Sequence, residues 1–180
     1  MNQEKSYTIG VFILGDYTKN FETLMELGQS LRPFNIRLYK EYSENKQFVA
    51  DSIEAGYNEQ FDDGRTTGKL LHICPATENI LKDIDNFFGY KNGNPVDGVI
   101  FGSDFKYSKD RINLKIAALH VYNENGLAVA VLNLGADAAR TIGKTYFDYD
   151  RNKKPIMLAE NTDDALEQLV NQIEQQNGRN

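Results

Sequence analysis

The stretch Thr8–Leu14 reads TIGVFIL, and Gly15 follows it directly. A strand with one face in water alternates apolar and polar residues, whereas this run is apolar at nearly every position. Several of its residues are β-branched, which favours an extended chain. The stretch therefore predicts a strand that is buried on both faces, as in a parallel sheet that helices cover on each side.

Segments of strand and helix character alternate along the rest of the chain. Further strands are expected at Asn35–Tyr39, Leu70–Cys74, Val96–Phe101, Leu127–Leu132 and Pro155–Ala159. Helical patterns cover 20–31, 43–60, 80–88, 109–122, 137–147 and the residues from 162 onward, with Thr77 and Thr162 as the expected N-caps of two of them. Strand followed by helix, repeated in this way, predicts parallel strands joined by right-handed crossovers.

The predicted fold class is therefore α/β. We expect a doubly wound, mostly parallel sheet of five or six strands with helices on both faces, flavodoxin-like or Rossmann-like. No linker or internal repeat divides the sequence, so residues 1–180 are expected to form a single domain. Within it, 61–105 is longer than such a fold requires and is interpreted as an insertion or a lid.

Composition excludes several classes of function. The formal net charge of -6 repels a phosphate backbone, so nucleic-acid binding is not expected. The longest apolar runs have the length of strands and are too short to span a bilayer. We therefore expect a cytoplasmic protein without a membrane partner. The only cysteine, Cys74, falls in an apolar run and is interpreted as a buried, inert thiol.

Polar and acidic residues follow three of the predicted strands directly. In doubly wound sheets, ligands bind beyond the carboxyl ends of the strands, so a site is expected on these loops. The candidate binding residues there are Gly15, Asp16, Tyr17, Asp104, Asn133 and Gly135. Each aspartate is equally suited to capping the helix that follows it. Several acidic groups at one edge would suit sugar hydroxyls, a metal ion or acid–base chemistry.

Common cofactor and metal motifs do not occur in the sequence. Gly64–Lys69 (GRTTGK) is similar to a phosphate-binding P-loop, but only three residues separate its glycines and Leu70 replaces the Ser or Thr. No G-x-G-x-x-G follows the first strand. With one cysteine and two distant histidines, His72 and His120, neither a metal site nor a cofactor is expected.

A longer pattern lies in residues 112–160. It consists of the buried strand at Leu127–Leu132, then Ile142-Gly143-Lys144, and then Lys154–Leu158 at the start of the last strand. This pattern resembles the C-terminal half of the nucleoside 2-deoxyribosyltransferase superfamily. The resemblance implies a nucleoside or nucleotide as the small-molecule partner, and action on its N-glycosidic bond.

The resemblance departs from the family at the catalytic position. The family's nucleophilic Glu aligns with Thr141, and its loop Asp aligns with Gly135. Asp137, four residues before Thr141, is then the candidate catalytic residue. Arg140 and Thr141 are candidate binding residues, Arg140 because a guanidinium pairs with phosphate or carboxylate. Whether the chain is an enzyme is left open.

Two alternatives remain beside this interpretation. The missing Glu favours a non-catalytic module of the same fold that binds a nucleotide or a sugar phosphate. A flavodoxin-like domain is the further alternative, although Asp16 would repel the phosphate of FMN. Aromatic residues at Tyr146, Phe147 and Tyr149 are interpreted as core or as the interface of a homo-oligomer.

Overall fold

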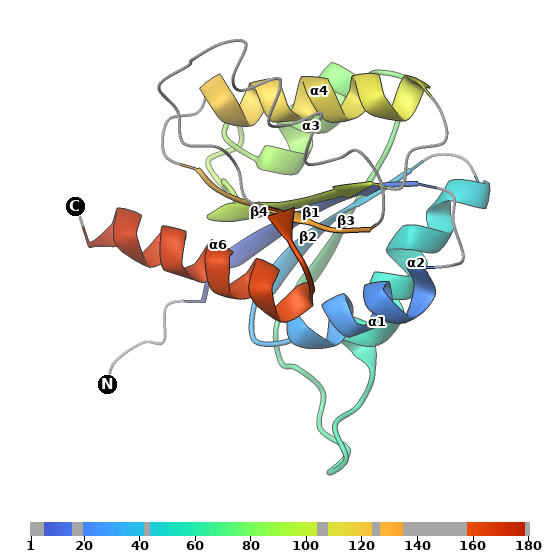
Figure 1. The fold of residues 1–180 in the computed structure, drawn as a ribbon, viewed down its shortest axis with the longest axis vertical. Helices are drawn as coiled ribbons and strands as arrows, with labels where there is room; N and C mark the ends of the chain where they lie inside the picture. Colours follow the sequence, from blue (N-terminus) through green and yellow to red (C-terminus); the bar gives the residue numbers. More distant parts are fainter. Residues whose placement is uncertain are drawn as a thin grey trace.

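A computed structural model describes residues 6–15, 20–41, 44–103, 108–123, 127–134 and 158–178 (Figure 1). Its centre is one sheet of six strands. These are β1 (Thr8–Leu14), β2 (Asn35–Lys40), β3 (Leu71–Pro75), β4 (Gly98–Ser103), β5 (Ala128–Leu132) and β6 (Leu158–Ala159). Their order in the sheet is β3-β2-β1-β4-β5-β6, and every pair of neighbours is parallel.

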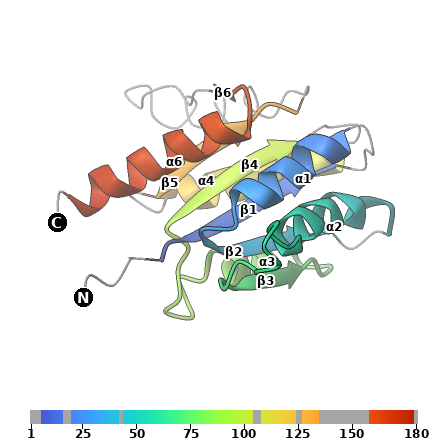
Figure 2. The same cartoon turned by 90° about the horizontal axis from the view of Figure 1, so that it is seen from below.

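Helices cover both faces of the sheet. They are α1 (Phe21–Ser30), α2 (Glu44–Asn58), α3 (Ile80–Phe88), α4 (Ser108–Asn123) and α6 (Thr162–Asn177). In Figure 1, α3 and α4 lie above the sheet, and α1, α2 and α6 lie below it. Figure 2 shows this lower layer from outside, with α1 between α6 and α2. The predicted doubly wound α/β class is therefore confirmed.

The side chains of β1 explain why the sheet has a core on each side. Ile9, Val11 and Ile13 point into the core beneath α1, α2 and α6. Phe12 and Leu14 point into the other core, against α3 and α4. All five side chains are at most 2% exposed. The strand is apolar on both faces because both faces are covered, as its sequence predicts.

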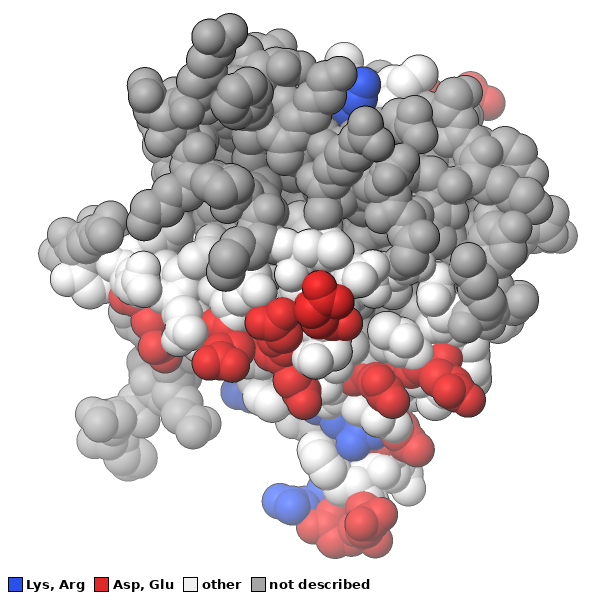
Figure 3. All heavy atoms as spheres, viewed as in Figure 1, with Lys and Arg blue, Asp and Glu red and all other residues white. Residues whose placement is uncertain are grey.

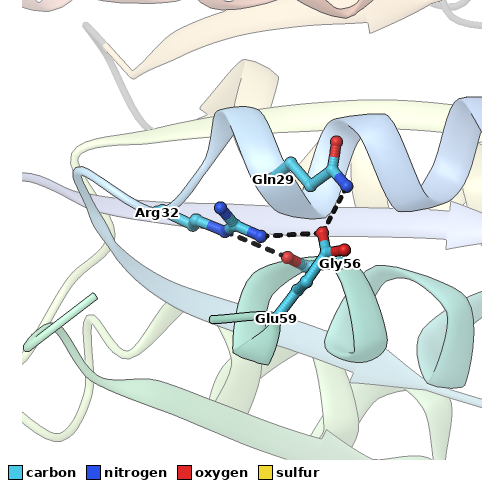
Figure 4. A network of polar contacts seen from close by, with 4 residues as sticks. All are labelled: Gln29, Arg32, Gly56 and Glu59. Carbon is cyan, nitrogen blue, oxygen red and sulfur yellow. Dashed lines mark hydrogen bonds and ion pairs between the residues drawn. The ribbon is translucent and has the colours of Figure 1, made fainter. Parts of the chain in front are cut away.

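A polar network joins the ends of α1 and α2 on the lower face (Figure 4). The guanidinium of Arg32 donates from Nε to the carbonyl of Gly56 at 3.2 Å and from Nη2 to Oε2 of Glu59 at 2.9 Å. The side-chain amide of Gln29 donates to the same carboxylate oxygen. Arg32 is mostly buried at this seam and links the end of α1 to the end of α2.

The two predicted N-caps are wrong by one or two residues. Asn79 caps α3 through its side chain, which accepts from the backbone N–H of Lys82, and Asn161 caps α6 by accepting from Asp164. Thr77 instead donates its hydroxyl to the buried carboxylate of Asp83. Asn favours the cap position at least as strongly as Thr, and in both cases it directly precedes the helix.

The segment 61–105 contributes central parts of the sheet. It supplies β3, α3 and β4, and β4 lies directly beside β1. The loop 59–70 before β3 is largely exposed and projects from the body of the molecule in Figure 1. The expected helix at 137–147 and the aromatic cluster at 146–149 lie outside the described residues. Each helix in the described part of the chain is too short or too polar to span a bilayer.

Candidate functional site

Between β1 and β4, the order in which the chain adds strands to the sheet reverses. From β1 the strands run outward through β2 to β3, and from β4 they run the other way through β5 to β6. β1 leads to α1 on one face and β4 leads to α4 on the other, so their carboxyl ends diverge. Ligands of open α/β sheets bind at this position. We call the carboxyl ends of β1 and β4, with the adjoining ends of β2 and β5, the switch point.

The first turn after β1 is held by a buried carboxylate. Oε2 of Glu41, which directly follows β2, accepts the backbone N–H of Gly15 at 3.0 Å. Glu41 is buried, with only 8% of its surface exposed. In dinucleotide-binding sheets the backbone N–H groups after the first strand bind phosphate. Here a carboxylate occupies that place, so its charge opposes a phosphate at this turn.

A buried hydroxyl lies at the end of β4. Ser103 is the last residue of the strand, pairs with Leu14 of β1, and has no exposed surface. Within the part of the chain that the structure describes, its Oγ has no hydrogen-bond partner. Buried polar groups in folded proteins are almost always hydrogen-bonded, because desolvating an unpaired hydroxyl is unfavourable. The hydroxyl of Ser103 is therefore open to a hydrogen bond that the described residues do not supply.

Two amides connect the end of β5 to its neighbours. The side chain of Asn20, just before α1, donates to the carbonyl of Leu134 at 3.3 Å and forms no cap on its own helix. Asn133 donates its side-chain amide to Glu160 at 3.3 Å, while its backbone N–H bonds to Ala159. These bonds bring the start of α1 and the residues after β5 and β6 to the same edge as Gly15 and Ser103.

The structure places two of the predicted site residues at this edge. Gly15 follows β1 and Asn133 follows β5, as the sequence indicates. The remaining candidates, Asp16, Tyr17, Asp104, Gly135, Asp137, Arg140 and Thr141, lie outside the described residues. The sequence argument missed Glu41 and Ser103. Ser103 stands beside Asp104, which was preferred for its charge, and nothing in a sequence shows that a hydroxyl is buried without a partner.

Metal-binding and nucleophilic groups are sparse in the described structure. No three His, Cys, Asp or Glu side chains of its residues lie close enough together to hold a metal ion. His72 is exposed on β3, and His120 stacks on Phe88 with ring centroids 4.9 Å apart. Cys74 is buried, and burial raises the pKa of its thiol to about 11, although the charge of Arg37 lowers it in part. A thiol with so high a pKa is a poor nucleophile at neutral pH.

Known proteins resemble this chain in structure and not in sequence. No protein-family profile matches it, and neither does any curated protein. The molybdenum cofactor carrier protein from Chlamydomonas reinhardtii superposes with a TM-score of 0.52 over 94% of this chain and 99% of its own, at 10% identity. The molybdenum cofactor binding protein from the phototrophic bacterium Rippkaea orientalis gives a TM-score of 0.50, covering 95% of this chain and 99% of its own, also at 10% identity. Likeness at this identity shows a shared fold.

These neighbours overturn the functional prediction from the sequence. Both are named for the molybdenum cofactor, so the suspected membership of the nucleoside 2-deoxyribosyltransferase superfamily is wrong, and so is the function inferred from it. Neither alternative, the nucleotide or sugar-phosphate module or the flavodoxin-like domain, is matched better. The physical reason is that a buried strand followed by a glycine-containing turn occurs throughout doubly wound folds. The pattern in 112–160 therefore reflected the fold and carried no information on the ligand.

Proposed function

We propose that this chain binds the molybdenum cofactor at the switch point and carries it as cargo. The observation that supports the proposal is the fold shared over nearly the whole length of both chains with two proteins named for binding or carrying that cofactor. The proposal places the ligand where parallel sheets of this order bind small molecules. It requires no reaction at the protein, which agrees with the few nucleophilic and acid–base groups described there.

The groups at the switch point suit different parts of this ligand. The cofactor is a pterin with a phosphate tail, and its own sulfur atoms hold the metal, so the protein needs no metal ligands. The amino and N–H edge of a pterin donates hydrogen bonds, which a carboxylate such as Glu41 accepts. Ser103 supplies a hydroxyl that lacks a partner among the described residues. The phosphate would lie close to the start of α1, because the helix dipole attracts an anion there. It would lie farther from the turn after β1, where the charge of Glu41 opposes it.

Cofactor retention tests the proposal directly. The purified chain is mixed with cofactor released from a molybdenum enzyme under exclusion of air, and unbound cofactor is removed by gel filtration. Bound molybdenum is measured by mass spectrometry and bound pterin by fluorescence after oxidation. We expect both to be retained in a fixed ratio to protein. If neither is retained, the chain is not a carrier of this cofactor.

Two serine variants locate the site. Ser103→Ala should weaken binding about tenfold, which corresponds to the loss of one hydrogen bond of about 1.4 kcal/mol. Its stability should not fall, because the hydroxyl has no described partner to lose. Ser52→Ala is the matched control, since Ser52 is buried in α2 and donates to the carbonyl of Phe48 at 2.7 Å, away from the switch point. Equal weakening by both variants, or unchanged binding in Ser103→Ala, would remove Ser103 from the site.

A further inference from the structure

A cavity lies at the amino end of the sheet, opposite the switch point. Its volume is about 390 Å³, which is in the range of pockets that hold small organic ligands. It is bounded by the starts of three strands and by the last turn of α3 with the loop after it, and it is open to solvent on one side. The lining residues are Thr8, Asn35, Ile36, Arg37, Leu70, His72, Asn86, Gly89, Asn92 and Asn94. The cavity is therefore separate from the proposed cofactor site.

Arg37 gives this cavity a positive charge. Arg37 is only 6% exposed, and it forms no ion pair with any carboxylate among the described residues. Nη1 donates to the carbonyl of Phe87 at 2.8 Å and Nη2 to that of Asn94 at 2.9 Å. These bonds use two of the five N–H groups of a guanidinium. They also place the cation at the C-terminal end of α3, which explains how the folded chain tolerates it.

The rest of the lining adds donors and no acid. None of the lining residues is Asp or Glu. His72 pairs with Arg37 in the register of β2 and β3, so both side chains leave the sheet on the same face. Asn86 and Asn92 add exposed side-chain amides on the α3 side. Leu70 is 74% exposed and supplies the apolar surface of the cavity. The cavity thus combines a cation, neutral donors and an apolar wall.

We propose that this cavity binds a small organic monocarboxylate with an apolar body. The guanidinium fork of Arg37 matches a carboxylate in shape, and Leu70 would contact the body of the ligand. A monoanion is favoured over phosphate because the carbonyls of Phe87 and Asn94, and the negative end of the α3 dipole, lie beside the guanidinium and oppose a second negative charge.

Binding of benzoate to the full chain tests the proposal by NMR. We expect saturable shifts of the backbone amides of Leu70, His72 and Asn92, with a Kd below about 1 mM. Benzamide has the same shape without the charge and should bind at least about tenfold more weakly, as should inorganic phosphate. Shifts that do not saturate, or that benzamide or phosphate reproduces at equal concentration, would overturn the proposal.

Isosteric charge variants test the site without disturbing Arg37. Asn92→Asp places a negative charge in the lining and should weaken benzoate binding at least about tenfold, because like charges repel where water is partly excluded. Asn171→Asp is the control, since Asn171 is exposed on α6 across the sheet and changes the net charge equally. Unchanged binding in Asn92→Asp, or equal weakening in Asn171→Asp, would show that benzoate binds elsewhere.

Discussion

At the scale of single residues, the reaction rate of Cys74 with a thiol reagent tests whether this buried thiol is inert. Burial raises its pKa to about 11, so almost no thiolate forms at pH 8. We expect the folded protein to react with a disulfide reagent such as DTNB at least about a hundredfold more slowly than the urea-unfolded chain, whose thiol titrates near its ordinary value. The absorbance of the released thiolate measures both rates. Equal rates would contradict a buried thiol at this position.

The same shift makes stability depend on pH in a defined window. The thiol keeps its proton in the folded protein at pH values where the unfolded chain has lost it, so unfolding is favoured there. This contribution to stability is fully present below the ordinary pKa of 9.0 and is lost as the pH rises towards about 11. Urea midpoints of wild type and Cys74→Ala between pH 8 and pH 11 separate it from other titrations. The wild type should lose more stability with pH than the variant, and parallel curves would contradict this.

The sequence predicted the roles of single residues in the two proposed sites least well. Arg37 lies in NIRLYK, which reads as an ordinary short strand, and only its bonds to Phe87 and Asn94 give it a role. Those contacts join residues that are 50 and 57 positions apart, so no local pattern indicates them. Gly15 and Asn133 were predicted because their position depends only on where a strand ends.

At the scale of elements, the packing of α1 on α2 depends on two glycines. A Cβ on Gly28 would lie 2.1 Å from the carbonyl oxygen of Ile53, and one on Gly56 would lie 2.1 Å from that of Met25. Both obstacles are backbone atoms, which cannot turn aside as a side chain can. Gly28→Ala should therefore destabilise the protein by about 3 kcal/mol, at the upper end for overpacking. Urea unfolding measures this change.

A second glycine variant controls for the change of residue type. Gly178 follows α6 in a right-handed conformation, with φ of -76°, and a Cβ there would meet its nearest atom at 3.4 Å. Gly178→Ala should leave stability unchanged or raise it slightly, because alanine restricts the unfolded chain. If Gly28→Ala is equally harmless, the helices can move apart, and the close approach is not required.

Elements were predicted well where burial alone determines them. β1 begins and ends at the predicted residues, since a strand covered on both faces is apolar from end to end. The caps of α3 and α6 were misassigned because Thr and Asn both occur within three residues of each helix start, and only hydrogen bonds distinguish them. Of the last strand, expected at Pro155–Ala159, Leu158–Ala159 is confirmed as β6, and 155–157 lie outside the described residues.

At the scale of the whole molecule, the sequence predicted a doubly wound sheet but not its ligand. The alternation of strands and helices follows from local patterns, and parallel pairing follows from the alternation. The order that puts β4 beside β1 depends on contacts between residues about ninety positions apart, such as Ile9 with Gly98. In folds of this kind the choice of ligand depends on a few side chains at the binding site, so the same fold serves many ligands.

Charge is distributed unevenly over the molecule. α6 carries Asp163, Asp164, Glu167 and Glu174, and α1 carries Glu22 and Glu26, while neither helix contains Lys or Arg. Figure 3 shows acidic side chains as a band across the side that these helices cover. The four ion pairs found among the described residues, including Arg32–Glu59 and Lys40–Asp51, involve no residue of α1 or α6. Repulsion within the band is therefore not balanced by those pairs.

Salt should stabilise this protein as a consequence. Raising the ionic strength from about 0.01 M to about 0.15 M shortens the screening length from about 30 Å to about 8 Å, which weakens repulsion along the band. Salt also screens the exposed ion pairs, but such pairs often contribute nothing measurable to stability, so we expect the weakened repulsion to dominate. The double variant Glu26→Gln/Glu167→Gln should be more stable than wild type at low salt by about 0.5 kcal/mol and should gain less from added salt. Asp62→Asn/Glu78→Gln removes two exposed acids outside the band and should keep the wild-type salt response. A urea midpoint that falls with salt in the wild type would show that attraction dominates the surface.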